Sequence, residues 1–477
     1  MMQPQPNPLE AHGSMAVPEA GPAAQTRAEP ALPPGPLAPR IVQTWHFMRR
    51  PFAFLDGCAR RYGDCFTVRL LGMPPGVILS DPEAIRDLLT ADDEAVVAGE
   101  SNASLLEPIL GRHSLLVLDG ARHLRQRRLM LPPFHGERMH VYGRIMCEIT
   151  EQVMSQWPVG RPFPIQHEMQ RITLEVILRA VFGVDDDAQR KRLRGAILRF
   201  LAFADGPGAA VIAIRAAQVD LGRLTPWGRF VYHRREIHRQ ILAAIAHRRA
   251  AGTAGRDDVL SMLIDARDED GAPMSDDELL DQLFTLLMAG HETTATALGW
   301  VFWCILARPE VQEGIQAELR RIAGESALDP RRVSELTYLD AVIKETARLH
   351  PVADGASRLL KKPMRLGRLY LPAGTGASPS TYLTHRRPDL WPEPERFRPE
   401  RFLETKPTPY EFLPFGGGVR RCLGMAFALV EMKIVLAEVL TRVELRAAPG
   451  YQVRVVRRSV TLAPSEGMPV VVERPAA

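Results

Sequence analysis

Cysteine is scarce in this chain of 477 residues, which contains five cysteines, at positions 58, 65, 147, 304 and 422. Because they are few, odd in number and widely scattered, they make a poor disulfide framework for a secreted protein. The sequence therefore predicts a reducing environment, and we expect a cytoplasmic protein.

Long apolar runs are also missing. No early stretch has the basic, apolar and small-residue order of a signal peptide, and no segment reaches the ~18 unbroken apolar residues of a membrane span. The nearest candidate, Leu279–Ala307, is interrupted by His291, Glu292, Thr293 and Thr294. This pattern predicts a buried helix and no membrane span.

The charge is only mildly basic, with a formal net charge of +4 and a pI near 8.8. This balance suits an acidic partner but is too weak to indicate nucleic acid, and neither a lysine-rich tract nor zinc-finger spacing is present. We therefore expect no nucleic-acid partner.

The first forty residues contain ten prolines and eight alanines, with almost no aliphatic clustering. Such a segment cannot bury enough surface to offset its chain entropy. We predict a disordered Pro/Ala-rich tail over residues 1–39 and a single domain over residues 40–477, since no second linker and no repeat is visible.

Apolar periodicity predicts a mainly α fold with a small β region. Helices are expected near 139–157, 167–182, 186–203, 229–250, 276–307, 310–323, 338–349 and 424–441. Strand-like runs occupy 65–71, 76–79, 366–371, 451–456 and 469–473. The sequence Ser275-Asp276-Asp277-Glu278 fits a capping box at the start of the longest helix.

The most informative segment is Phe415-Gly416-Gly417-Gly418-Val419-Arg420-Arg421-Cys422-Leu423-Gly424. Its glycines permit tight turns and a close approach to a flat ligand, and an apolar helix follows. Cys422 then lies just before a helix N-terminus, where the helix dipole and two arginines favour a thiolate. An isolated cysteine is more often a small buried hydrophobe, which is our interpretation of the other four.

Every fixed position of the pattern Phe-x-x-Gly-x-Arg-x-Cys-x-Gly is present, and the segment thereby resembles the haem-binding loop of the cytochrome P450 family. The resemblance implies a haem b that lies between a long distal helix and the helix after the cysteine loop. It also implies that Cys422 is the axial iron ligand, that Phe415 packs near its sulfur, and that Arg420 faces a haem propionate. A thiolate ligand favours cleavage of the oxygen–oxygen bond.

A second motif, Ala289-Gly290-His291-Glu292-Thr293-Thr294, places a carboxylate and a hydroxyl within an apolar helix, where burial is costly without a partner or a task. One explanation is a polar kink in which Thr293 bonds back to a carbonyl one turn earlier. The run also resembles the acid–alcohol motif of the family. By that resemblance Thr293 hydrogen-bonds the activated oxygen and Glu292 relays protons, while Ala289 and Gly290 leave room above the cofactor.

Glu345 and Arg348 are spaced to pair on one helical face, which alone is usually an exposed pair of little energy. Pro399-Glu400-Arg401-Phe402 follows in the family's order, so the resemblance implies a buried ionic triad of Glu345, Arg348 and Arg401 with a folding role. The similar string Pro394-Glu395-Arg396-Phe397 is a competing match.

His123 and Arg127 are one helical turn apart, so they can reach one anionic ligand together. A basic helix face is ordinarily only solvated, but this segment resembles the family's propionate site, and Arg358 resembles a further propionate ligand. Arginines nearby, including Arg125, Arg128 and Arg421, could present a basic surface to an acidic redox protein.

The resemblance implies a monomeric monooxygenase that inserts one atom of dioxygen into a hydrophobic molecule, such as a fatty acid or terpenoid. Electrons would come from a separate ferredoxin or flavodoxin with its reductase. The alternatives are a peroxide-driven or isomerase member of the same fold, or a non-enzymatic haem sensor. The expected substrate pocket draws on residues 99–117, 284–288, 352–357 and 463–468, where Asp354 either forms a turn or faces the substrate.

Overall fold

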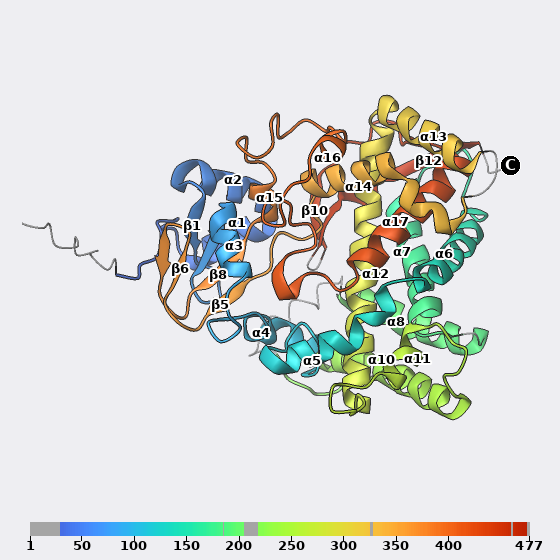
Figure 1. Cartoon of the computed structure of the whole chain (residues 1–477), viewed down its shortest axis with the longest axis horizontal. Helices are drawn as coiled ribbons and strands as arrows, with labels where there is room; N and C mark the ends of the chain where they lie inside the picture. Colours follow the sequence, from blue (N-terminus) through green and yellow to red (C-terminus); the bar gives the residue numbers. More distant parts are fainter. Residues whose placement is uncertain (1–28, 185, 205–217, 325–327, 459–460, 475–477) are drawn as a thin grey trace, which may run out of the picture.

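The structure, a computed structural model, describes residues 29–184, 186–204, 218–324, 328–458 and 461–474. Figure 1 shows a small strand-rich part at one side and a larger body of helices at the other, with the long helix α12 (Asp276–Leu306) running through that body. The prediction of a mainly α fold with a small β region is confirmed.

Helices form most of the described chain. Beside α12 they are α1 (Arg40–Arg49), α2 (Pro51–Tyr62), α3 (Pro82–Leu89), α4 (Gly99–Leu110), α5 (Gly120–Met130), α6 (Arg138–Met154), α7 (Ile165–Val176), α8 (Asp187–Ala204), α10 (Pro226–Ala251), α11 (Val259–Asp265), α13 (Pro309–Ala323), α14 (Thr337–Leu349), α15 (Thr381–Thr384), α16 (Arg401–Glu404) and α17 (Met425–Arg442). Single turns are η1 (Pro132–Phe134), η5 (Pro330–Glu335), η6 (Gly418–Arg420) and η7 (Ser465–Gly467), and the π-helical turn η2 (Ile177–Val181) follows α7.

The strands of the described residues are short and fall into four sheets. They are β1 (Cys65–Val68), β2 (Gly76–Leu79), β3 (Val96–Val97), β4 (Phe163–Pro164), β5 (Arg358–Leu360), β6 (Met364–Leu366), β7 (Leu369–Leu371), β8 (Gly376–Pro379), β9 (Glu444–Ala447), β10 (Val455–Arg458), β11 (Thr461–Pro464) and β12 (Pro469–Arg474). The largest sheet has the order β1-β2-β8-β5-β3, in which β2 and β8 are parallel and the other pairs antiparallel.

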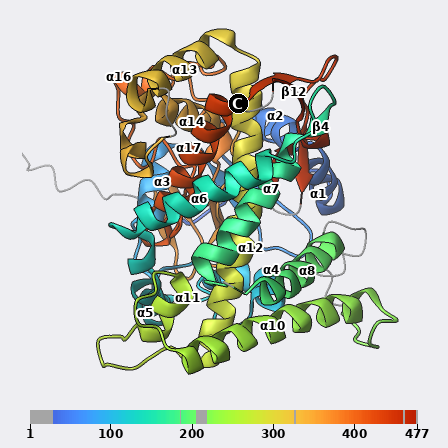
Figure 2. The same cartoon turned by 90° about the vertical axis from the view of Figure 1, so that its right-hand side faces the viewer.

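The helix α12 organises the core. The capping box predicted at Ser275 and Glu278 is present, since each side chain accepts a hydrogen bond from the other residue's backbone N–H. Beyond this start the helix is mostly apolar and packs against α7, α10, α14 and α17. Figure 2 shows α6 and α7 crossing in front of it. None of the helices in the described part of the chain is long and apolar enough to cross a membrane.

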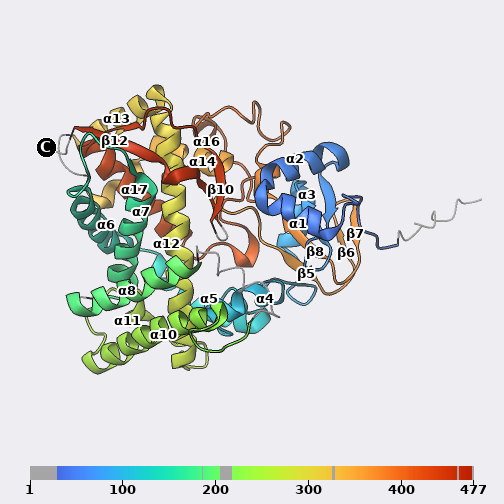
Figure 3. The same cartoon turned by 180° about the vertical axis from the view of Figure 1, so that it is seen from behind.

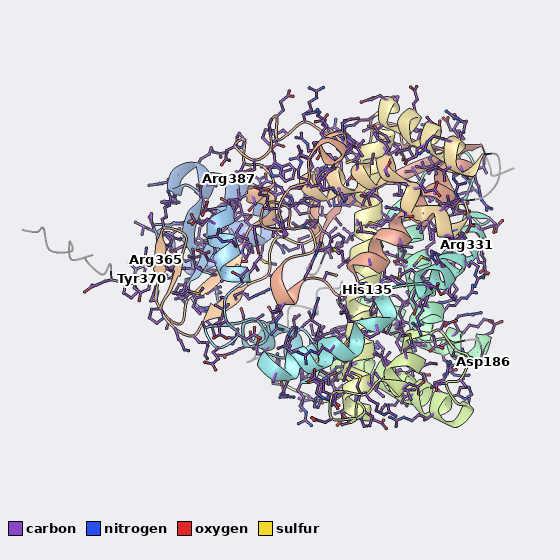
Figure 4. The ribbon with its side chains drawn as sticks, in the orientation of Figure 1. His135, Asp186, Arg331, Arg365, Tyr370 and Arg387 are labelled. Atoms are coloured by element: carbon purple, nitrogen blue, oxygen red, sulfur yellow. The ribbon has the colours of Figure 1, made fainter. Side chains whose placement is uncertain are left out.

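The eight predicted helices correspond to α6, α7 with η2, α8, α10, α12, α13, α14 and α17. The predicted strand over 366–371 is instead the hairpin of β6 and β7, because Gly367 adopts a left-handed conformation with a φ of 53° and reverses the chain. Figure 4 labels Arg365 and Tyr370, which face each other across this hairpin at the outer end of the strand-rich part.

The predicted tail over residues 1–39 lies partly within the described residues. Residues 1–28 lie outside the described residues, but the chain after them is held by hydrogen bonds. The amide of Ala31 donates to the carbonyl of Tyr370, and Thr67 donates to the carbonyls of Pro33 and Pro34. A proline-rich segment without aliphatic clusters can therefore be ordered by its backbone carbonyls, which composition does not reveal.

Candidate active site

The cysteine loop is shaped by its glycines. Gly416 and Gly418 have φ values of 66° and 61°, in the left-handed region that favours glycine. A Cβ on Gly418 would lie 2.1 Å from the carbonyl oxygen of Leu89, at the end of α3. The close approach that was predicted for these glycines is therefore made, at Gly418, to the protein backbone at Leu89. The loop closes where the amide of Cys422 donates to the carbonyl of Phe415 at 2.9 Å.

Cys422 lies three residues before α17, and its side chain is exposed. Desolvation nevertheless raises the pKa of its thiol, against the opposing effects of the Gly424 amide, Arg127 and Arg421. The helix N-terminus and the two arginines thus act in the expected direction, and desolvation acts against them. Arg420 is engaged by Asp119 and by the carbonyl of Leu115, and coordination to a metal ion would favour the deprotonated form of Cys422.

Four basic side chains converge near this loop. His123 and Arg127 come from α5, Arg358 from β5, and Arg420 from η6. Burial, followed by the charges of Arg420 and Arg127, lowers the pKa of His123 to about 3. Burial and then the charge of Arg420 lower the pKa of Arg358 to about 10. Asp119 is the acid that pairs with this cluster, at 2.6 Å from Arg420.

The Asp119 carboxylate is already shared. It accepts hydrogen bonds from the amides of Ala98, Gly99 and Glu100 at 2.9, 2.7 and 2.8 Å, and thereby satisfies the N-terminus of α4. The cluster of His123, Arg127, Arg358 and Arg420 therefore keeps an excess of positive charge. Asp119 was not predicted from the sequence, although its position just before α5 was a possible signal.

The cluster fits a buried anionic group. His123 is 1% exposed, and its Nδ1 has no hydrogen-bond partner in the part of the chain that the structure describes. A buried donor without a partner is costly, as is a desolvated cation without a counter-charge. Two carboxylates of a haem would satisfy both requirements, and the exposed Cys422 would supply the iron ligand. The residues present thus fit haem b.

The helix α12 has an exposed residue near its centre. Ala289 is exposed although most residues on either side of it along α12 are buried. A Cβ on Gly290 would lie 3.3 Å from the Ile177 side chain, so the absence of a side chain at Gly290 allows α12 to pack closely against η2. Of the two small residues, Ala289 is therefore the one that faces open space. Thr293 donates to the carbonyl of Ala289 at 2.6 Å. This is the back-bond that the alternative explanation of the motif expected.

Glu292 is held by polar groups. Its Oε2 accepts from Nε2 of Gln170 on α7 at 2.7 Å, and its Oε1 accepts from the hydroxyl of Thr296 at 3.4 Å. Thr296 in turn accepts from Nε2 of Gln166 at 3.1 Å. Gln166, Gln170 and Thr296 were not predicted from the sequence, because nothing in their local sequence shows that α7 crosses α12 at this point.

One loop joins the helix to the cysteine segment. The amide of Leu115 donates to Oε1 of Gln282 on α12 at 3.0 Å, and the carbonyl of Leu115 accepts from Arg420 at 3.3 Å. The Thr285 hydroxyl also donates to the hydroxyl of Ser114 at 2.7 Å. The loop before α5 therefore fixes the position of α12 relative to Arg420.

Glu345, Arg348 and Arg401 are brought together as a buried cluster. Arg348 donates to both oxygens of Glu345 at 2.7 and 2.8 Å, and Arg401 donates to Glu345 at 3.1 Å. In contrast, Arg396 of the competing string has an exposed side chain that pairs with Glu393. Arg401, and not Arg396, therefore belongs to the buried cluster with Glu345 and Arg348, as the order of the motifs along the sequence predicted.

The predicted basic surface is smaller than expected. Arg125 pairs with Asp268 at 2.6 Å and with Glu278 at 2.9 Å, and Arg128 pairs with Glu269. These acids neutralise the two arginines, so the basic surface cannot rest on them. Arg421 is exposed and carries no ion pair within the described residues.

Charged residues of the expected substrate pocket bond elsewhere. Asp354 accepts from the amide of Tyr382 at 2.8 Å and from the hydroxyl of Ser380 at 3.1 Å, and so stabilises the start of α15. Gly355, with a φ of 81°, completes the turn. Glu100 pairs with Lys361 at 2.9 Å. Of the two alternatives for Asp354, the turn agrees with these bonds.

Comparisons with known proteins agree with this geometry. The family model described as Cytochrome P450 matches residues 30–469. Cytochrome P450 135B1 of Mycobacterium bovis is 40% identical over 438 residues, covering 91% of this chain and 90% of that protein. Cytochrome P450 137 of Mycobacterium tuberculosis is 35% identical over 443 residues, with 91% and 90% covered.

Solved structures are similar over nearly the whole chain. A cyanobacterial protein titled as retinoic acid-bound CYP120A1 has a TM-score of 0.82 and 25% identity, covering 94% of this chain and 99% of its own. The cytochrome P450DA haem domain has a TM-score of 0.79 at 22% identity, with 94% and 98% covered. The second likeness bears on the fold alone.

Proposed function

Because this chain belongs to the cytochrome P450 family, a family of haem-thiolate monooxygenases, we propose that Cys422 is its iron ligand and that it oxygenates a hydrophobic small molecule. The observation that carries the proposal beyond the family is the position of Glu292 and Thr293. They lie one turn after exposed Ala289 on α12, and the Thr293 hydroxyl donates to the carbonyl of that residue.

Haem, when bound, supplies the redox chemistry that activates dioxygen. His123, Arg127, Arg358 and Arg420 would hold its propionates, since all four lie in the cationic cluster. The Nδ1 of His123, which has no partner among the described residues, would be the donor. Phe415 closes the loop behind Cys422 through its carbonyl.

Glu292 and Thr293 would deliver protons. The Glu292 carboxylate is oriented by Gln170 and Thr296, and Thr293 carries a hydroxyl one residue further along α12. A carboxylate held by two donors can accept a proton from solvent and pass it on when its side chain turns. Gln170 and Thr296 act here as positioning residues.

The substrate is proposed to be apolar, of the fatty-acid or terpenoid class. Two charged groups in the expected pocket segments, Asp354 and Glu100, are engaged by other residues. In the segment 463–468, Glu466 and Met468 have φ values of 56° and 55°, and such strained non-glycine residues are frequent at functional sites. The solved relative bound to retinoic acid supports the terpenoid alternative.

Electrons are proposed to come from an acidic ferredoxin or flavodoxin that contacts the surface around Arg421. The exposed guanidinium lies next to the cysteine ligand in sequence and is not neutralised by a described acid. Arg421→Glu should slow reduction at low salt, and the effect should shrink as salt rises. Arg128→Glu is the control, since Arg128 is already paired with Glu269.

The test of the function is a screen of fatty acids and terpenoids for a change in the haem spin state, followed by turnover with dioxygen and a ferredoxin system. Formation of a product that carries one oxygen atom from dioxygen supports the proposal. Turnover with peroxide alone would favour a peroxide-driven enzyme. If no compound of either class shifts the spectrum or is converted, the proposed substrate class is wrong.

A further inference from the structure

A cavity of about 540 Å³ lies at the start of α12, where α4, the loop after it and α10 meet this helix. Figure 3 shows α4, α10 and this end of α12 together at the lower side of the helical body. From Asp281, which lines the cavity, to Glu292, the axis of α12 advances roughly 16 Å at 1.5 Å per residue. The cavity is therefore separate from Glu292 and Thr293, and its volume suits a small organic molecule.

Two side chains of α10 line this cavity without partners. Arg234 and His238 are one helical turn apart, so they lie on the same face of the helix. Within the described residues Arg234 makes neither a hydrogen bond nor an ion pair, and its Nε is buried. The Nε2 of His238 is also buried without a described partner, while its ring packs edge-on against Phe284 at 5.3 Å. Burial lowers the pKa of His238 to about 4, so the neutral ring can donate from Nε2.

Two acids line the same cavity from α12. Asp277 and Asp281 are also one turn apart, and the Asp281 carboxylate accepts from the amide of His113 at 3.0 Å. Neither acid forms an ion pair with Arg234. Burial lowers the pKa of Arg234 and raises that of Asp281, and in each case the charge of the other residue opposes the shift. Opposite charges on two packed helices thus interact across the cavity without closing it.

The two pairs require an occupant with groups of both signs. A guanidinium and a neighbouring imidazole N–H together bind a carboxylate, and two carboxylates attract an ammonium group. A bare metal ion is a poorer occupant, because no three His, Cys, Asp or Glu side chains of the described residues are placed to hold one. A simple anion such as phosphate would meet the two acids with like charge.

The rest of the lining is partly apolar. Ala103 and Pro108 of α4 and Leu280 of α12 contribute apolar surface. Glu107 and Arg112 also line the cavity, but they are exposed to solvent and of opposite sign. An apolar side chain on the occupant would cover the three apolar residues.

We propose that this cavity, the α10–α12 cavity, binds a zwitterionic amino acid with an apolar side chain. The carboxylate of the ligand binds Arg234 and His238, and its ammonium group binds Asp277 and Asp281. Because such a ligand has no net charge, it supplies partners to groups of both signs without adding an unpaired charge to a buried place. The proposal does not depend on the haem chemistry or on the identity of the substrate.

Calorimetric titration of the full-length holoenzyme with L-phenylalanine tests the proposal. Two analogues report on the two contacts separately, since 3-phenylpropanoate lacks the ammonium group and L-phenylalaninamide lacks the carboxylate. Each analogue should bind at least roughly tenfold more weakly than L-phenylalanine. The absorption spectrum of the haem should stay constant during these titrations, because the cavity is separate from the haem pocket.

Substitutions assign the contacts to residues. Arg234→Gln should weaken the binding of L-phenylalanine at least roughly tenfold. Asp277→Asn should weaken it by roughly three- to tenfold, since Asp277 is exposed. The matched controls are Arg235→Gln and Asp276→Asn, because these neighbours are exposed on the same helices and do not line the cavity. Both controls should bind L-phenylalanine like wild type.

A structural role of Arg234 would appear in stability. Since Arg234 has no partner among the described residues, Arg234→Gln should leave the urea midpoint of the ligand-free holoenzyme unchanged or raise it. A lower midpoint would show that the arginine stabilises Asp281 and would overturn the proposal. So would the absence of L-phenylalanine binding, equal binding by Arg234→Gln, or a haem spectrum that shifts as the ligand binds. Equal or tighter binding of inorganic phosphate or 3-phenylpropanoate would overturn it in favour of a simple anion site.

Discussion

Glu345 is 0% exposed, and its charge is stabilised by two arginines that approach from different segments. Arg348 comes from the same helix, and Arg401 from α16. Arg396 lies in an almost identical sequence string but is solvated. At the scale of the residue, burial distinguishes Arg401, which the fold requires, from Arg396, which it does not.

Replacement of the buried arginine should destabilise the protein. Arg401→Ala leaves Glu345 with half of its counter-charge, and we expect it to lower the free energy of unfolding by about 3 kcal/mol. Arg396→Ala should change it by less than about 1 kcal/mol. Urea unfolding of the two holoenzyme variants measures this difference. Equal effects would show that Arg401 is not a member of the cluster.

The network around Glu292 gives a second prediction for single residues. Gln170→Leu or Thr296→Val removes a donor to the Glu292 carboxylate, so its orientation is lost while the acid remains. The ratio of product formed to electrons consumed should fall roughly three- to tenfold.

The matched control for this prediction is Thr173→Val. Thr173 donates to the backbone carbonyl of His291 at 3.1 Å, across the same contact of α7 with α12. It should lower stability slightly and leave the coupling ratio unchanged. If Thr173→Val and Gln170→Leu lower the ratio equally, the effect is one of packing, and the positioning role is refuted.

Helix α17 carries an acid inside the core. Glu431 is 2% exposed, and its Oε1 has no hydrogen-bond partner within the described residues. Burial raises the pKa of its carboxyl to about 8. Its pKa in the unfolded chain is about 4.3. Between these values the folded state binds the extra proton, so the free energy of unfolding should fall as pH rises.

Glu431→Gln should remove the contribution of this carboxyl to the pH dependence of the free energy of unfolding. The variant should gain stability relative to wild type as pH rises from about 5 to about 8, with little further gain above. Urea midpoints of both proteins across this pH range provide the measurement. A difference between the two proteins that stays constant with pH would contradict burial of an uncompensated acid.

Helix α14 depends on a side chain of its neighbour. Its N-cap residue, Leu336, offers no side-chain hydrogen bond. Glu318 of α13 instead accepts from the amides of Tyr338 and Leu339 at 2.8 and 3.0 Å. Glu318→Ala should therefore lower the free energy of unfolding by about 1 to 2 kcal/mol. Glu313→Ala, at an exposed position of the same helix, should have almost no effect in the same unfolding assay.

At the scale of the whole molecule, much of the fold was predictable because long helices leave a strong apolar period. The helix α12 and its capping box were located from a few residues. Strand-like runs were located near β1, β2 and β12, whereas the short strands β3, β4, β5 and β8 were missed. The helix α1 was also missed, since an outward apolar stripe and a buried Gln43 reverse the usual pattern. Backbone contacts that order residues 31–38 are not encoded in composition.

The candidate site was predictable where it resembles a motif, as at Cys422, Glu292 and His123. The hydrogen-bonding and ionic partners of the site residues were not predicted, because they come from distant segments. Asp119 and Gln170 belong to the site only after α4, α5, α7 and α12 have packed. The same holds for the acids that neutralise Arg125. Such long-range pairing is a property of the assembled molecule.

The central claim is that this chain holds a haem through the thiolate of Cys422, on the evidence of a cationic cluster that fits two carboxylates. The most direct measurement is the absorption spectrum of the reduced, carbon monoxide-bound protein. Wild type should show the red-shifted band of a thiolate-ligated ferrous haem, and Cys422→Ser should lose it. If Cys422→Ser retains that band, Cys422 is not the ligand and the account fails.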